Sequence, residues 1–306
     1  METREVKPVP TISAWLTFGA SLLASNAAAT SVVSEISTSA PENTLVSFRM
    51  AVEKGAPWFE LDCTLSMDNE AIVIHDLTLD RTTDLKGRVD QHTLAELKKA
   101  DAGIRFGEAF KGEGIPTLGE SLDFAKGRIG VYIEIKNSAD DTVVMDTILA
   151  RADAGTLPDR AAMLRMIEES GSRNIELVRR VVREVRARKM EREVVIHSFS
   201  PVVCAVMLAE APDLRTEFLA MSSKEKPEQW PWFLRWLDLL DPHGFNPYEG
   251  DVTKELIDKI HARGKSIAAW VVDEEADMRR FAEWGVDLLI TDKPDVALAV
   301  LKDMAL

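Results

Sequence analysis

The sequence contains only two cysteines, Cys63 and Cys204, among its 306 residues. Two thiols cannot form a disulfide framework, and they do not make a cysteine-based zinc site. Cys63 directly follows Asp62, and its simplest interpretation is a small buried apolar residue. The chain must therefore be stabilised by its core rather than by cross-links.

Positive charge is also scarce. The chain has 37 basic and 51 acidic residues, which gives a formal net charge of −14. A nucleic-acid groove or a patch for anionic membranes needs an excess of lysine and arginine on one face. We therefore expect no nucleic-acid partner, and no membrane binding that relies on charge.

Long hydrophobic runs are missing as well. The most apolar run near the N-terminus, residues 12–24, is too short for a comfortable transmembrane span. Small residues follow at 25–29 and would suit signal-peptidase cleavage, although Arg4 and Lys7 are offset by nearby glutamates. Residues 1–30 are thus either a signal-like segment, which predicts a periplasmic or secreted protein, or an extension packed on the domain of a cytoplasmic one.

Hydrophobic residues make up 46% of the chain, which is enough for one large core in residues 31–306. Apolar runs alternate with helical patterns, which is typical of α/β proteins with a parallel sheet. One helix is expected to start at Pro41, with the proline in its first turn. Eight strands favour a (β/α)8 TIM barrel. The expected strands lie at 31–34, 58–62, 129–135, 193–199, 214–219, 244–247, 266–272 and 287–291.

The second expected strand carries two acidic residues, Glu60 and Asp62. They are two positions apart, so both carboxylates point to the same face of the strand. The link to residues 71–74 is too short for a crossover helix, so we expect this segment to pair antiparallel with the strand before it. The pairing would bring His75 back towards the two carboxylates. A polar, glycine-rich insertion at about 77–118 follows.

Glu134 and Lys136 lie at the end of another expected strand. In TIM barrels the working residues sit at the carboxyl ends of strands, so Glu60, Asp62 and Glu134 should converge. Close carboxylates repel, and oxygen ligands suit Ca²⁺ or Mg²⁺. Lys136 can neutralise a phosphate oxygen, and together these groups indicate phosphoryl-transfer chemistry.

Structural alternatives exist for each of these residues. Glu60 or Asp62 could form ordinary ion pairs with Arg81 or Lys136, and Glu134 with Lys136 a salt bridge at the strand end. His75 can transfer a proton near neutral pH, or it can simply cap the hairpin.

Residues 229–236 are unusually aromatic and include Trp230, Trp232 and Trp236. One interpretation is a helix whose tryptophans pack on the barrel. The other is an aromatic lip that contacts a lipid-like substrate or a membrane surface.

Seven motifs occur in one order between residues 41 and 295. They are Pro41–Leu45, Glu60–Asp62, His75–Thr83, Ile115–Leu118, Ile133–Lys136, Ser198–Phe199 and Gly285–Pro294. Together they resemble the glycerophosphodiester phosphodiesterase family. The resemblance implies a (β/α)8 barrel with a small insertion at about 77–118. It implies a phosphoric diester hydrolase of lipid and glycerol metabolism, which converts glycerophosphodiesters to an alcohol and glycerol 3-phosphate with Ca²⁺ or Mg²⁺.

The same resemblance assigns roles to individual residues. The metal ligands of the family correspond to Glu60, Asp62 and Glu134. One of its two acid/base histidines corresponds to His75, and its phosphate-binding lysine to Lys136.

The family also has a His-Arg pair eight residues before the proline of its Pro-Glu-Asn-Thr motif, where this chain has Val33 and Ser34. Valine cannot transfer a proton, and serine cannot clamp a phosphate as arginine does. Three interpretations follow: an active hydrolase in which another group such as His197 takes over, a catalytically impaired relative that binds a metal and a phosphodiester or partner, or an enzyme whose first strand is altered by a misplaced start or a local sequence error.

Overall fold

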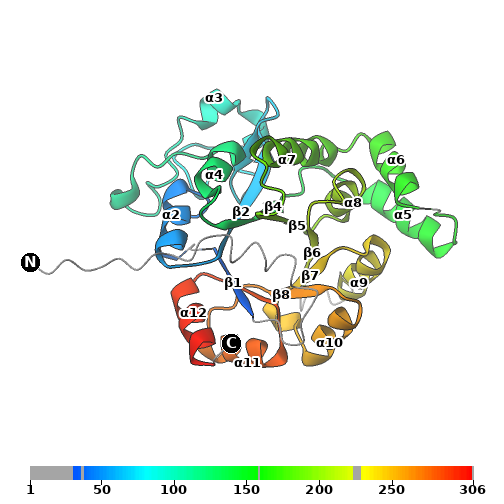
Figure 1. Cartoon of the computed structure of the whole chain (residues 1–306). Coiled ribbons are helices and arrows are strands. Elements are labelled where there is room, and N and C mark those ends of the chain that lie inside the picture. Colours follow the sequence, from blue (N-terminus) through cyan, green and yellow to red (C-terminus); the bar gives the residue numbers. More distant parts are fainter. Residues whose placement is uncertain (1–29, 36–37, 158, 223–228, 305–306) are drawn as a thin grey trace, which may run out of the picture.

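A computed structural model of the chain describes residues 30–35, 38–157, 159–222 and 229–304 (Figure 1). All but the last residue of the signal-like segment expected at 1–30 lies outside these residues.

Nine strands form one sheet in the described part of the chain, and eight of them are parallel. Strand β1 pairs with β2 on one side and with β9 on the other, which closes the sheet into a barrel. The prediction of a (β/α)8 TIM barrel in the α/β class is confirmed. The strands are β1 (Ser31–Ser34), β2 (Trp58–Leu65), β3 (Ala71–Val73), β4 (Gly130–Ile135), β5 (Val194–Ser198), β6 (Thr216–Ala220), β7 (Gly244–Pro247), β8 (Ser266–Ala269) and β9 (Leu288–Thr291).

Helices surround the barrel on its outside (Figure 1). Their apolar sides and the outer faces of the strands form the largest buried cluster. The long helical region between β4 and β5 is interrupted after residue 153 and again after residue 170, so three helices cover that crossover. The helices are α2 (Leu45–Glu53), α3 (Leu94–Leu97), α4 (Leu118–Ala125), α5 (Thr142–Asp153), α6 (Arg160–Ser170), α7 (Asn174–Arg188), α8 (Pro201–Glu210), α9 (Gln229–Leu240), α10 (Lys254–Ala262), α11 (Glu275–Trp284) and α12 (Pro294–Asp303).

The interior of the barrel has a separate apolar cluster, with Val33, Tyr132 and Ile290 among its members. These side chains come from three strands and fill the barrel, so its interior is packed and is not a pore. The working surface is therefore at the carboxyl ends of the strands, above this layer.

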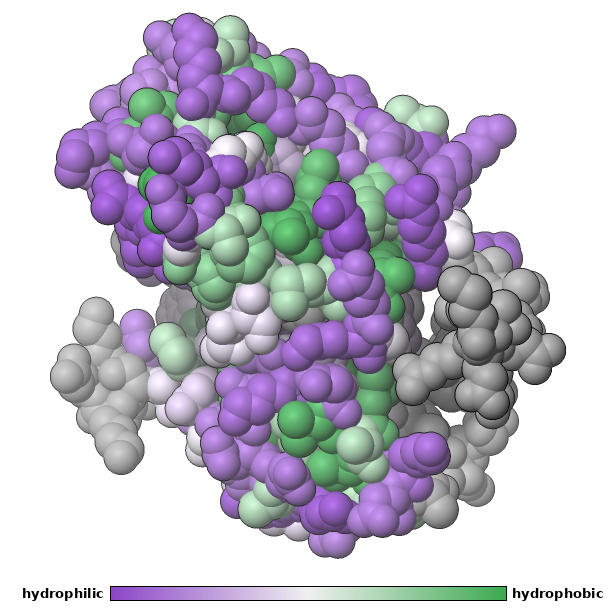
Figure 2. Space-filling model, turned by 90° about the vertical axis from the view of Figure 1, so that its left-hand side faces the viewer, coloured by the Kyte–Doolittle hydropathy of each residue, from purple (hydrophilic) through white to green (hydrophobic). Residues whose placement is uncertain are grey.

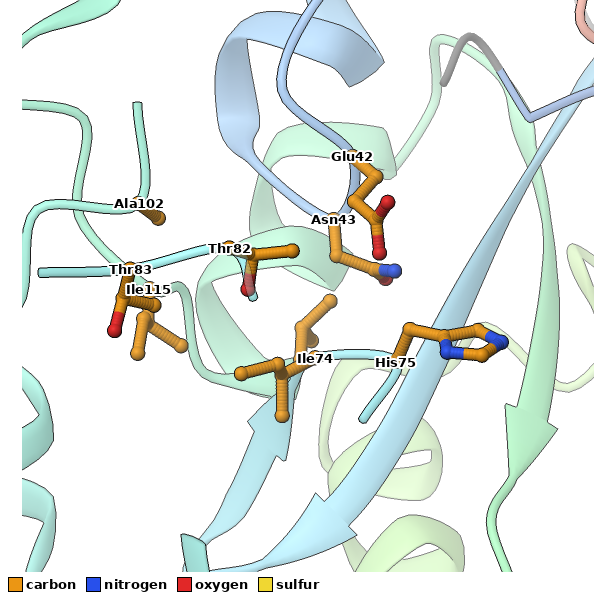
Figure 3. A pocket seen from close by; sticks show the side chains of 9 residues that line it. Glu42, Asn43, Ile74, His75, Thr82, Thr83, Ala102 and Ile115 are labelled. Carbon is orange, nitrogen blue, oxygen red and sulfur yellow. The ribbon is translucent and has the colours of Figure 1, made fainter. Parts of the chain in front are cut away.

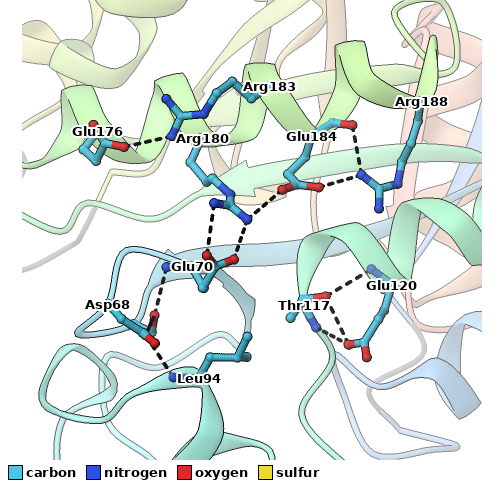
Figure 4. Close-up of polar contacts among 11 residues, drawn as sticks. Asp68, Glu70, Leu94, Thr117, Glu120, Glu176, Arg180, Arg183, Glu184 and Arg188 are labelled. Atoms are coloured by element: carbon cyan, nitrogen blue, oxygen red, sulfur yellow. Dashed lines mark hydrogen bonds and ion pairs between the residues drawn. The ribbon is translucent and has the colours of Figure 1, made fainter.

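Strand β3 pairs antiparallel with β2, with Cys63 opposite Val73 and Leu65 opposite Ala71, as the short link predicts. Arg180 on α7 contacts Glu70 in the hairpin turn and Glu184 on its own helix (Figure 4). The insertion that follows has its own small apolar core. The hairpin is thus held from both sides.

The expected start of the first long helix at Pro41 is wrong, because α2 begins at Leu45. Thr44 is the N-cap: its hydroxyl accepts the Ser47 N–H at 3.4 Å, and Ser47 Oγ accepts the Thr44 N–H at 3.3 Å. This reciprocal capping box fixes the helix start. Residues 41–43 lie before the helix, and Asn43 has a positive φ of 56°.

The aromatic stretch lies on α9, and the prediction that Trp236 contacts a membrane surface is wrong. Trp236 is fully buried, and its ring lies 6.1 Å from that of Trp232. Trp230 and Trp232 are partly buried and pack against the same core. The structure favours the alternative in which this helix packs on the barrel.

Hydrophilic side chains dominate the face seen in Figure 2, and hydrophobic ones lie between them in patches. Among the described residues, no helix has the length and apolar character needed to cross a bilayer.

Candidate functional site

Acidic side chains from two neighbouring strands meet at the carboxyl end of the barrel. Asp62 on β2 is the register partner of Glu134 on β4, and Glu134 is the partner of His197 on β5. Glu60 is two residues before Asp62 and faces the same way. Glu60, Asp62 and Glu134 each offer an oxygen within 4.8 Å of the others. The structure thus brings together the three residues predicted as metal ligands.

Lys136 lies inside this cluster, as its position after Glu134 predicts. Its Nζ is 2.7 Å from Asp62 Oδ1 and 2.8 Å from Glu134 Oε1, and only 13% of its side chain is exposed. Burial favours a raised pKa for Asp62, but Lys136, His75 and Asn43 outweigh it and hold the pKa below its ordinary value. These are the ion pairs that the structural alternative predicts, and they hold the Lys136 ammonium within the acidic cluster.

The remaining carboxylates are not neutralised by this one lysine. Burial raises the pKa of Glu134 to about 7, against the opposing effect of Lys136. Burial, reinforced by Asp62 and Glu35, raises the pKa of Glu60 well above its usual value. The three carboxyl groups therefore resist full ionisation beside a single lysine.

Asn43 was not predicted as a site residue, yet it holds Asp62 directly. Its Nδ2 donates to Asp62 Oδ2 at 2.7 Å, and its Oδ1 accepts the Asp62 N–H at 2.8 Å. The signal was present in the Pro41–Leu45 motif, which predicts a helix start and carries part of the family resemblance but does not by itself mark Asn43 as a partner of Asp62.

The first strand ends at the same cluster. Val33 is fully buried in the apolar interior, so the position identified by counting from Pro41 lies below the site. Ser34 pairs with Phe59, which places Glu35 level with Glu60. Burial, together with Asp292, Asp62 and Glu134, raises the pKa of Glu35 to about 8. Glu35 is therefore a further carboxylate beside the cluster.

His75 returns to the cluster through the hairpin, as predicted. The N–H of the preceding Ile74 donates to the Asp62 carbonyl at 3.0 Å. The His75 side chain is 53% exposed, and its Nδ1 donates to Asp76 Oδ1 at 2.7 Å. In Figure 3 its ring points away from the Thr82–Thr83 side of a crevice that Asn43 and His75 also line.

Arg81 does not pair with Glu60 or Asp62, so the Arg81 part of that alternative is wrong, whereas its Lys136 part holds for Asp62. Its guanidinium donates to both oxygens of Glu42 at 2.6 and 2.7 Å, and to both oxygens of Asp76 at 2.8 and 2.9 Å. These bidentate bonds tie the insertion to the segment before α2. They also fix the carboxylate that orients His75.

The family model for the glycerophosphoryl diester phosphodiesterase family matches residues 36–296. The glycerophosphodiester phosphodiesterase of Caldanaerobacter subterraneus subsp. tengcongensis is 32% identical over 267 residues, which cover 87% of this chain and 94% of the relative. The crystal structure of glycerophosphodiester phosphodiesterase from Agrobacterium tumefaciens is 27% identical, with a TM-score of 0.65 over 88% of this chain and 99% of that one. A Silicibacter pomeroyi structure assigned to the same activity is 25% identical, with a TM-score of 0.73 over 94% and 98% of the two chains.

Proposed function

The chain belongs to the glycerophosphoryl diester phosphodiesterase family, a family of phosphoric diester hydrolases, and on that premise we propose that it hydrolyses glycerophosphodiesters to an alcohol and glycerol 3-phosphate with a divalent cation. One observation carries the proposal: Glu60, Asp62 and Glu134 converge beside Lys136 at the end of the barrel where TIM-barrel enzymes work.

The residues of the cluster fit Ca²⁺ or Mg²⁺. All three proposed ligands are carboxylates, which are hard oxygen donors. Burial and mutual repulsion raise the pKa values of Glu60 and Glu134, so ionising all three carboxyl groups is unfavourable unless a divalent ion offsets their charge. A bound cation would neutralise the charge that develops on the phosphate oxygens.

The chain's own residues would do the rest. Lys136 supplies a positive charge for a phosphate oxygen, since its ammonium is already held at the cluster. His75 donates through Nδ1 to Asp76, so Nε2 is the nitrogen left to exchange a proton with an attacking or leaving oxygen. Asn43 keeps Asp62 aimed at the cluster through its two hydrogen bonds.

The test is release of glycerol 3-phosphate from glycerophosphocholine with Ca²⁺ or Mg²⁺. We expect release from the full chain and a loss of about 10²–10⁴-fold in rate for His75→Ala. The control is His92→Ala, because His92 contacts the Lys86 carbonyl rather than the cluster. No release above buffer from a folded protein would overturn the proposal.

A second function has its own support in the first strand. Val33 fills apolar space below the site, so the end of the first strand brings Glu35 to the cluster in place of the histidine and arginine that the family resemblance implies there. A chain that binds a metal and a phosphodiester without turnover would show a cation-dependent rise in melting temperature and no product. No shift with either ligand would exclude this function as well.

Two further proposals concern location. We propose that residues 1–29 direct export to the periplasm or outside the cell, to be tested by N-terminal sequencing of the chain purified from each compartment. Retention of the intact N-terminus inside the cell would contradict the export proposal.

We also propose that Trp230 and Trp232, without Trp236, contact a membrane surface. The test is vesicle flotation of Trp230→Ala and Trp232→Ala, and flotation equal to that of the wild type would contradict this proposal.

A further inference from the structure

A buried carboxylate lies deep in the barrel, below the acidic cluster. Glu217 on β6 is fully buried, and it accepts from Arg215 Nε at 2.7 Å and from Ser266 Oγ at 3.2 Å. Burial alone would raise the pKa of Glu217, but Arg215 and Asn246 bring it below its ordinary value. Glu217 is thus an ionised acceptor at a fixed place.

This acceptor orients the amide of Asn246 on β7. Asn246 Nδ2 donates to Glu217 Oε2 at 2.9 Å, and the reverse orientation would place the amide oxygen against a carboxylate. The residue is fully buried, and its main-chain carbonyl accepts the Trp270 indole N–H at 2.8 Å, which fixes the backbone that carries the amide. The amide therefore has a single orientation, with one hydrogen left for a second acceptor.

The second acceptor is a ring nitrogen of His197 on β5. His197 Nδ1 lies 3.5 Å from Asn246 Nδ2, which can only donate, so Nδ1 carries no hydrogen. A ring with a free Nδ1 carries its hydrogen on Nε2. Burial also lowers the pKa of His197 to about 4, which agrees with a neutral ring.

The Nε2–H points at the acidic cluster. His197 is 2% exposed, and its Nε2 has no hydrogen-bond partner of good geometry among the described residues. The carboxylate oxygen that lies beside this nitrogen is Glu60 Oε1, with 3.4 Å between Nε2 and Oε1. The ring is held edge-on to Tyr132, with centroids 5.4 Å apart. The ring thus faces Glu60 rather than solvent, which favours a role for His197 through Glu60 over direct replacement of the strand-end histidine.

We propose that His197 is a positioning residue: its Nε2 lies 3.4 Å from Glu60 Oε1, the Nε2–H closes to a hydrogen bond when Glu60 turns to hold a divalent cation, and Glu217 and Asn246 set the tautomer that makes this possible. The inference rests on the proposed function in one respect, that Glu60 is a ligand of the divalent cation. Metal-ligating groups are commonly oriented by such neighbours, and their loss costs about 10–100-fold in metal affinity.

Two substitutions in the full chain separate orientation from packing. His197→Phe keeps an aromatic ring against Tyr132 but has no N–H, whereas His197→Gln keeps an amide donor. We expect calorimetric titration with Ca²⁺ and Mg²⁺ to show about 10–100-fold weaker binding for His197→Phe and recovery of most of that loss in His197→Gln. Wild-type affinity in His197→Phe would overturn the proposal and leave the proposed function intact.

A measurement on the wild-type protein covers the case in which a variant does not fold. Two-bond ¹H–¹⁵N spectra distinguish the two neutral tautomers of each histidine. His243 serves as an internal reference, because its Nδ1 accepts the Thr216 N–H at 3.0 Å. We expect His197 to be the Nε2–H tautomer, with an Nε2 signal that moves on adding Ca²⁺ and in Glu60→Gln.

The outcomes are distinct. An Nδ1–H tautomer, or an Nε2 signal that ignores Glu60→Gln, would overturn the proposal whatever the enzyme does. If the wild-type chain binds neither cation, the proposal that the enzyme uses a divalent cation fails. The effect of Glu60→Gln on the Nε2 signal then decides by itself whether His197 contacts Glu60.

Discussion

Asn43 and Asp62 exchange two hydrogen bonds: the Asn43 amide donates to a carboxylate oxygen at 2.7 Å and accepts the Asp62 N–H at 2.8 Å. One side chain therefore fixes both the backbone and the carboxylate of Asp62. Asn43 does so from a positive φ of 56°, a conformation that asparagine and glycine tolerate better than other residues.

The first prediction follows from this pair. Asn43→Gly accepts the backbone conformation but removes both hydrogen bonds, so it isolates their contribution. Leaving the buried Asp62 N–H unpaired should cost about 1–3 kcal/mol of unfolding free energy, measured by urea denaturation, and should weaken divalent-cation binding. The matched control is Asn69→Gly, an exposed turn asparagine with φ of 61°. Equal losses in the two variants would contradict the special role of Asn43.

The barrel and most of the cluster could be predicted from the sequence because both follow from strand periodicity. A two-residue spacing puts Glu60 and Asp62 on one face, and the short link returns His75 to them. The place of Glu35 could not be predicted in this way, because counting from Pro41 assumes a fixed loop length. Register decides it instead, since the pairing of Ser34 with Phe59 sets the level of Glu35.

The side-chain partners of Asn43 and His197 could not be predicted from the sequence for a different reason. Asn43 and Asp62 are 19 residues apart, and Asn246 and His197 are 49 apart, so their contacts exist only once the barrel has closed. No local pattern marks such pairs. The buried tryptophan of α9 was ambiguous from sequence because an aromatic stripe serves a core and a membrane surface equally well.

Lys136 gives the second prediction. It pairs with Asp62 and Glu134 within a mostly buried cluster, so Lys136→Met leaves carboxylates without their counter-ion. Removing one partner of a buried ion pair typically costs roughly 3–5 kcal/mol. We expect a large fall in the melting temperature of the cation-free protein and a larger rise on adding Ca²⁺ than in the wild type. Lys126→Met, at an exposed lysine, is the control. A smaller Ca²⁺ effect than in the wild type would contradict the charge argument.

The third prediction is a pH dependence. The pKa values of Glu134 and Glu35 are raised from 4.5 to about 7 and about 8 in the folded protein. The folded state therefore binds more protons than the unfolded state above about pH 4.5. The free energy of unfolding that these two groups contribute is lost as pH rises through 7 and 8. Bound cation must displace these protons. We expect the melting temperature to gain more from Ca²⁺ at pH 8.5 than at pH 6.5, and an equal gain would contradict the prediction.

The choice of pH 6.5 as the lower limit has a physical reason. His197 is a buried neutral histidine with a folded pKa of about 4 and an ordinary value of 6.5. Its depressed pKa contributes stability that is lost as pH falls from 6.5 towards 4, which is the opposite direction. Above pH 6.5 the ring is mostly neutral in both states, so the change measured there belongs to the carboxylates.

Glu35 gives the last prediction, which tests whether the first strand still contributes to the site. At pH 8.5, above the pKa of about 8 that burial gives Glu35, Glu35→Gln removes one negative charge beside Glu60 and Glu134 while keeping the shape of the side chain. The lost repulsion should stabilise the cation-free protein, and about 2–4 °C in melting temperature is expected for each kcal/mol in a domain of this size. The same lost charge should weaken Ca²⁺ binding. Glu53→Gln, at an exposed glutamate of α2, should change neither quantity. If Glu35→Gln lowers the cation-free melting temperature, Glu35 forms a stabilising contact and does not add to the repulsion, and the view of it as a surplus carboxylate fails.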